Sequence, residues 1–224
     1  MDENDKSIEK IISTEWELFT SVNEGQERAS CQEDRATFEG MRAAQFKAWS
    51  TLAISSYLDD LMAARQNGRN LIEEKYIHMM ETTEPAQYEA LRSRLTAPPD
   101  AVRSLAREVS DILIDQTRLM FELYPYVSGR GRPLYSAFDN GGISVETYQF
   151  SELLTYSEKT LSALKEHVER LAKDGISLAR VILENTVKFY GYQSLESAES
   201  ATKARADEVE IQVSFGCSSG NCDI

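Results

Sequence analysis

Two segments with helical periodicity carry polar side chains where an apolar face is expected. These residues lie three or four positions apart, so within each segment they share one side of a helix. They are Arg42, Gln45 and Trp49 in the first segment, and Glu146, Gln149, Glu152 and Tyr156 in the second. Burying an isolated charge costs several kcal/mol, so buried charges must be paired. We therefore expect Glu39, Arg42, Glu146 and Glu152 to satisfy one another around a polar pocket.

Such a pocket favours proton-transfer chemistry without a cofactor on a small polar or amino-acid-like metabolite. Isomerisation, elimination, cyclisation and hydrolysis all need a positioned acid or base, and Glu39, Glu146 or Glu152 could act as one. Arg42 would bind an anionic group. The residues expected to orient the substrate are Gln45, Trp49 and Tyr156. The alternative is a structural ion-pair network or a solvated helix face, which the sequence leaves open.

Cysteine chemistry has weaker support. Cys31 follows Arg28 by three residues, and a nearby cation lowers a thiol pKa, so Cys31 is a candidate nucleophile and Arg28 a candidate substrate contact. No histidine lies near Cys31 in the sequence. Cys217 and Cys222 provide two thiols, fewer than the four ligands of a closed zinc site, and are interpreted as free thiols in a tail.

The segment 124–144 contains four glycines and two prolines and shows no apolar period. A loop of this length in a compact domain is usually a lid, a binding loop or disordered. Arg130 and Arg132 lie within it, and Arg132 is a candidate contact for a substrate carboxylate or phosphate. The pattern lacks the Gly-Lys-Ser/Thr ending of a phosphate-binding loop, and a solvated loop is the alternative.

No metal or cofactor is predicted. The metal sites of ferritin-like bundles use Glu-x-x-His pairs, and neither His78 nor His167 belongs to one. A carboxylate-bridged metal oxygenase is therefore the third functional hypothesis. It comes after the acid–base enzyme and after a non-catalytic module that binds a small ligand or a protein, with the segment 124–144 as its contact surface.

Apolar residues recur at helical spacing along most of the chain, which predicts an all-α bundle of about seven helices. One long helix is expected from Ala36 to Gln66 and another from Ser144 to Asp174. Asn67-Gly68 and Asp174-Gly175 are stop signals, because glycine accepts the left-handed conformation after a helix. A single helical domain over 1–208 and an irregular tail over 209–224 follow from this pattern.

The two halves of this domain, roughly 7–97 and 98–206, share an order of elements at an offset of 107 residues. Each has a loop, a long helix, an Asn/Asp-Gly stop and a capped shorter helix, and Trp49-Ser50 matches Tyr156-Ser157. This order predicts two pseudo-equivalent halves around a shared core. Any two helical hairpins could share such punctuation, so chance similarity stays open.

Composition excludes several classes of function. The 224 residues carry a net charge of −13, which disfavours nucleic acid and anionic membrane surfaces. No stretch approaches the length of a membrane span, and Met1 to Glu9 lacks the apolar core of a signal peptide. A cytoplasmic protein with a small-molecule partner is expected, while its oligomeric state stays open.

Several strings resemble an uncharacterised family of bacterial and fungal proteins defined only as a domain of unknown function. They are NEGQERASCQED (23–34), TFEGMRAAQFKAW (37–49), SYLDDL (56–61), NGRNLIEEKYIHMM (67–80), TYSEKTL (155–161) and ILENTVKFYGYQSLESAE (182–199). The resemblance covers about 11–199 and implies no reaction. It implies that both halves belong to one unit. It also draws attention to Asn185 and Tyr190 as further substrate-binding candidates.

Overall fold

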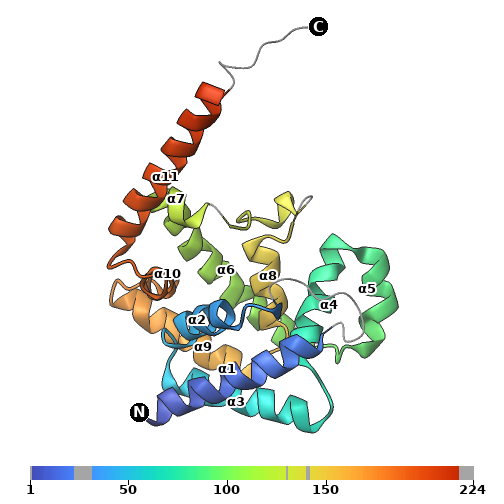
Figure 1. Cartoon of the computed structure of the whole chain (residues 1–224). Helices are drawn as coiled ribbons and strands as arrows, with labels where there is room; N and C mark the ends of the chain where they lie inside the picture. The colour runs from blue at the N-terminus through green and yellow to red at the C-terminus, as the bar shows by residue number, and fades with distance from the viewer. Residues whose placement is uncertain (1, 23–31, 130, 140–141, 217–224) are drawn as a thin grey trace, which may run out of the picture.

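The computed structural model describes residues 2–22, 32–129, 131–139 and 142–216, with side chains as far as residue 208 (Figure 1). The described residues form an all-α fold with eleven α-helices and no β-strand. The fold class is therefore as predicted, whereas the expected number of about seven helices is too low.

The helices have the following bounds: α1 Glu3–Ser21, α2 Arg35–Phe46, α3 Thr51–Gln66, α4 Leu71–Thr83, α5 Pro85–Leu91, α6 Asp100–Leu123, α7 Pro125–Ser128, α8 Val145–Leu153, α9 Glu158–Lys173, α10 Leu178–Phe189 and α11 Leu195–Gly216.

The prediction of continuous helices over 36–66 and 144–174 is wrong, because each segment breaks in the middle. The break between α2 and α3 occurs at Ser50, whose hydroxyl accepts a hydrogen bond from the Ala53 N–H at 3.2 Å. Ser157 accepts from the Thr160 N–H at the same distance and begins α9. A serine that caps the first free N–H groups favours a new helix over continuation of the old one.

The predicted tail also begins too early. α11 extends to Gly216, beyond the expected limit at residue 208, and projects away from the other helices in Figure 1. Once nucleated, a helix adds residues at little cost, so an exposed rod can continue without an apolar stripe. The expected loop 124–144 contains α7 and a short 3-10 helix at Ser136–Phe138.

The core is built where α3 packs against α9, with α1 against α3 and α6 against α9. The outer contacts exchange partners along the chain, since α4 packs on α8 and α10 packs on α2. This arrangement brings α2 and α8, which carry the polar lines noted in the sequence, to opposite sides of one interior space.

Corresponding elements of the two halves start and stop at matching positions. The bounds of α3 and α9 differ by 107 residues at both ends, and so do the first residues of α4 and α10. Gly68 and Gly175, also 107 apart, both follow their helices with left-handed backbones, at φ of 69° and 71°. These glycines let the chain reverse direction where another residue would be strained.

Candidate functional site

Arg42 is the centre of a buried cluster of charges. Its side chain leaves α2 and contacts Glu15 of α1, with Arg42 Nε donating to Glu15 Oε2 at 2.7 Å and Nη2 donating to Glu15 Oε1. The Tyr57 hydroxyl also donates to Glu15 Oε1, at 2.6 Å. Glu15 has no exposed surface and Arg42 only 7%. The paired geometry compensates for removing both charges from water.

Glu152 of α8 lies on the other side of Arg42 and accepts hydrogen bonds at both carboxylate oxygens. Arg42 Nη1 donates to Oε1 at 3.0 Å and the Tyr156 hydroxyl donates at 2.7 Å. Lys75 Nζ of α4 contacts Oε2 at 3.3 Å. Gln45 accepts from Arg42 at 2.8 Å and donates to Glu152 at 3.4 Å. Two cations and two anions thus balance within the cluster.

The cluster holds its charges in place across the physiological pH range. Burial alone would raise the pKa of Glu152, but Arg42 and Lys75 hold that pKa well below its usual range. Burial would lower the pKa of Lys75, and the contacts with Tyr148 and Glu152 raise it above its usual value instead. Burial and the neighbouring carboxylates also raise the phenol pKa values of Tyr57 and Tyr156. None of these four groups is ready to exchange a proton near neutral pH.

A cavity of about 820 Å³ adjoins this cluster. Aliphatic and aromatic side chains of α2, α6, α8, α9, α10 and α11 form most of its wall, and Glu152 is its only acidic lining residue among the described residues. Its polar lining residues are Gln45, Thr117, Ser128, Arg132, Tyr148, Gln149, Glu152, Thr186, Thr202 and Arg205, together with the hydroxyls of Tyr126, Tyr156, Tyr190 and Tyr192. The volume lies within the roughly 300 to 1,000 Å³ typical of small-molecule sites.

Two of the predicted acid–base residues lie outside the charged cluster. Glu39 is on the surface of α2, where its side chain is 43% exposed and pairs with Arg35 at 2.7 Å. Glu146 accepts from the backbone N–H and the hydroxyl of Ser136 at 2.9 and 2.8 Å. It lies 3.8 Å from Arg107 and therefore anchors the segment before α8. Of the three proposed carboxylates, only Glu152 reaches the cavity.

The predicted substrate contacts are divided among several places. Arg42 and Gln45 belong to the charged cluster, and the rings of Trp49 and Tyr156 meet edge to face beside it. Asn185 donates to the Ala44 carbonyl at 3.0 Å and ties α10 to α2 rather than lining the cavity.

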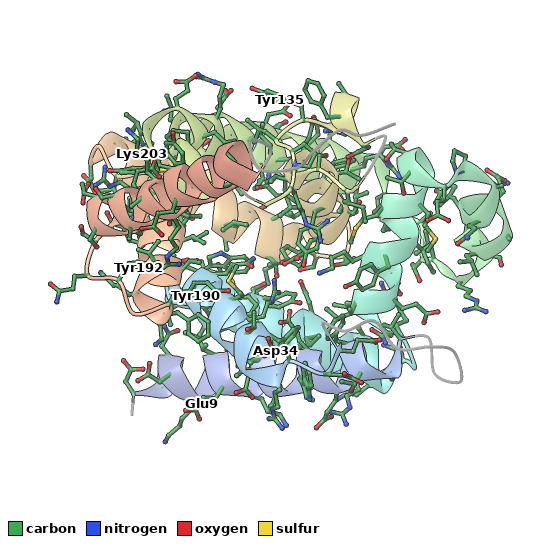
Figure 2. All side chains as sticks on the ribbon, turned by 45° about the horizontal axis from the view of Figure 1, so that its top comes forward. Glu9, Asp34, Tyr135, Tyr190, Tyr192 and Lys203 are labelled. Atoms are coloured by element: carbon green, nitrogen blue, oxygen red, sulfur yellow. The ribbon has the colours of Figure 1, made fainter. Side chains whose placement is uncertain are left out.

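Residues near the cavity rim complete the predicted set. Tyr190 lies just after α10, lines the cavity and is 55% exposed (Figure 2). Arg132 also lines the cavity, and its guanidinium carbon lies 4.8 Å from the centre of the Tyr148 ring. Arg28 and Cys31 lie outside the described residues, so their proposed roles stay predictions.

Four residues of the cluster were missed by sequence reasoning: Glu15, Tyr57, Lys75 and Tyr148. A signal for two of them was present. Glu15 lies three and four residues after Ile12 and Ile11, on the apolar face of α1, and Lys75 follows Leu71 and Ile72 on the apolar face of α4. A lone charge inside an apolar helical stripe indicates a buried partner on another helix.

Other kinds of site were also searched for in the described part of the chain. No three His, Cys, Asp or Glu side chains gather there in a way that could hold a metal ion. None of the described helices is both long and apolar enough to cross a membrane. The nearest charged neighbours of Glu152 are the cations Arg42 and Lys75.

The fold and site define a helical protein with an apolar cavity whose inner end meets a neutral network of buried charges. Comparison with known families places it further: the chain belongs to the family described as "Protein of unknown function (DUF4125)", which matches residues 5–200. No curated protein and no solved structure matches the chain. The resemblance seen in the sequence is thereby confirmed.

Proposed function

We propose that this protein binds a largely apolar small molecule in the cavity between α2, α6, α8 and α10. The observation that carries this proposal is the cavity wall itself, which is mostly aliphatic and aromatic and has one carboxylate, Glu152, already neutralised by Arg42 and Lys75. Burying an apolar ligand there removes apolar surface from water, which stabilises the complex by about 25 cal/mol per Å². This ligand differs from the polar metabolite expected from the sequence.

The charged cluster supports this function by fixing the shape of the cavity. Arg42 links α1, α2 and α8 through its bonds to Glu15 and Glu152, and Lys75 adds α4. A network whose members are all satisfied stiffens the surrounding helices. The cavity is therefore held open by polar contacts outside its apolar wall, and a ligand finds a site that is largely preformed.

A neutral fluorescent probe, N-phenyl-1-naphthylamine, tests the proposal. We expect saturable fluorescence enhancement at one site per chain. Ala179→Trp places a large ring on the cavity wall and should reduce binding at least tenfold, whereas Ala172→Trp on the exposed face of α9 should leave it unchanged. Equal binding by both variants, or no binding by the unmodified protein, would refute the proposal.

The acid–base enzyme is the second candidate, with a different proton donor. Lys75 donates to the Tyr148 hydroxyl at 2.8 Å, and this hydroxyl lines the cavity. The pKa of Glu152 is held too low for exchange at neutral pH, so Tyr148 is the better acid. Untargeted mass spectrometry of a metabolite extract tests this role. Turnover by the unmodified protein should be lost in Tyr148→Phe, and equal turnover in both would exclude it.

We also propose that the halves 7–97 and 98–206 are copies of one unit. The matched helix bounds, the two left-handed glycines and the exchanged pairing of α4 with α8 and α10 with α2 support this origin. Superposing 35–83 on 142–190 in an experimental structure is the test. Helix axes that fail to align would contradict a duplication.

A further inference from the structure

The Tyr148 hydroxyl has an unused proton that faces the cavity. It accepts a hydrogen bond from Lys75 Nζ at 2.8 Å, and within the described part of the chain it donates to no acceptor. Lys75 is itself held by Glu152 at 3.3 Å and lies 4.3 Å from the centre of the Tyr148 ring. The ring is thus fixed from behind by a cation, and its remaining bond is available to an oxygen in the cavity.

Arg132 lies against the same ring with most of its donors free. Its guanidinium carbon is 4.8 Å from the Tyr148 ring centre, and Nη1 donates to the Ile143 carbonyl at 3.1 Å. Among the described residues, no carboxylate lies within ion-pair distance of Arg132. A guanidinium has five N–H donors in a fixed fork, so one carbonyl leaves room for a bidentate partner.

The charge of the cavity lining is complementary to an anion. Its two basic lining residues in the described chain are Arg132 and Arg205, and Arg205 donates to the Tyr192 hydroxyl at 2.9 Å without a carboxylate partner there. The single acidic lining residue, Glu152, is neutralised by the buried cations. A positive lining is unexpected in a chain with a net charge of −13.

We infer that the ligand is an amphipathic carboxylate, whose head group lies between Arg132 and the Tyr148 hydroxyl and whose apolar body fills the cavity toward α10. Arg132 would bind the carboxylate through two N–H donors, and Tyr148 would donate a charge-assisted hydrogen bond. This inference rests on the proposed function, because it assigns a head group to a ligand that the cavity must first admit.

Competition with bound N-phenyl-1-naphthylamine separates the head group from the apolar body. Decanoate and 1-decanol have the same ten-carbon chain and differ at the head, so their relative affinities report on the anion. We expect decanoate to displace the probe with at least tenfold higher affinity than decanol at pH 7.5. Raising the salt concentration should reduce the advantage, because charge attraction is screened.

Variants locate the head group. Arg132→Met should lower decanoate affinity about tenfold and leave decanol affinity unchanged, and Tyr148→Phe should lower decanoate affinity severalfold. Arg118→Met removes an exposed arginine that pairs with Glu122 outside the cavity, and it should change neither affinity. Arg132 is exposed, so its loss should not unfold the chain, and retained probe binding verifies this.

The outcomes distinguish this inference from the function on which it rests. Probe binding without any preference for decanoate would overturn the carboxylate and leave the apolar site standing. A preference that is lost in Arg205→Met but kept in Arg132→Met would overturn the assigned position of the head group. Failure of the unmodified protein to bind the probe would remove both proposals.

Discussion

Lys75 on α4 and Ile182 on α10 are 107 residues apart, and their surroundings differ in charge. Lys75 faces α8, where it contacts Tyr148 and Glu152. The positions equivalent to these two on α2 are Met41 and Gln45, and with Ile182 they line the cavity. Equivalent helix pairs thus hold a charged network in one interface and an apolar wall in the other. Backbone arrangement alone therefore does not decide where a site forms.

The largest effect in this comparison is expected for Arg42. Arg42→Met leaves Glu15 and Glu152 buried without their shared cation, which should lower the free energy of unfolding by about 3 to 5 kcal/mol. Its equivalent, Gln149, donates only to the carbonyl and hydroxyl of Ser110, each at 3.2 Å. Gln149→Met should cost about 1 kcal/mol. Urea denaturation of both variants measures the difference, and equal losses would break the comparison.

Lys75 should show coupling to Glu152 that Ile182 lacks. Lys75→Met removes one of the two cations at Glu152 and should cost about 2 to 3 kcal/mol, since a buried carboxylate loses compensation. Adding Glu152→Gln should recover at least about 1 kcal/mol of that loss, because the uncompensated charge disappears. Ile182→Met, a volume-conserving change, should cost less than about 1.5 kcal/mol. Strictly additive effects in the Lys75 and Glu152 pair would contradict the network.

The sequence predicted the elements better than it predicted the partners. The all-α fold, the Asn-Gly and Asp-Gly stops and the polar lines on α2 and α8 follow from local periodicity and capping. Local pattern also placed Arg42, Gln45, Glu152 and Tyr156 on helix faces directed inward. It could not identify Glu15 or Lys75 as their partners, because those contacts join α1 and α4 to helices between 27 and 77 residues away.

Two errors had a physical origin that is visible in the sequence after the fact. Ser50 and Ser157 cap new helices, so each predicted long helix is two shorter ones whose axes can diverge around the cavity. Glu39 and Glu146 lie three to six residues from cluster members, yet their helical positions direct them to Arg35 and Ser136. Spacing along a helix assigns a face, whereas burial depends on the helix that covers it.

A third difference concerns His78 on α4 and Asn185, its equivalent on α10. Asn185 donates to the Ala44 carbonyl, whereas His78 is buried and its Nδ1 has no hydrogen-bond partner in the described part of the structure. Burial, together with nearby Arg103, lowers the pKa of His78 to about 4 from its usual 6.5. The unfolded chain therefore binds more protons than the folded chain between these two values.

Stability should consequently decrease on acidification through this window. The contribution of neutral His78 is fully present above pH 6.5 and is lost as the pH falls toward 4. Between pH 7.5 and pH 5 the free energy of unfolding should fall by roughly 1 to 2 kcal/mol through this residue. Urea denaturation at both pH values measures it, and His78→Gln should remove that part of the dependence. An unchanged pH dependence in the variant would show that His78 is not the titrating group.

The smallest effect is expected where a predicted catalytic carboxylate lies on the surface. Glu39 and Arg35 are both exposed, and solvent-exposed ion pairs contribute about 0 to 1 kcal/mol, near 0.3 to 0.5 for neighbours four apart on a helix. Glu39→Gln should therefore change the urea midpoint little and leave probe binding unaffected. Glu152→Gln, which leaves Arg42 and Lys75 without their shared anion, should destabilise the chain strongly. Because both residues are glutamates on polar helix lines, a large effect of Glu39→Gln would mean that the side chain meets a partner in solution that its exposed position on α2 does not provide, and the separation of the buried network from the surface would have to be redrawn.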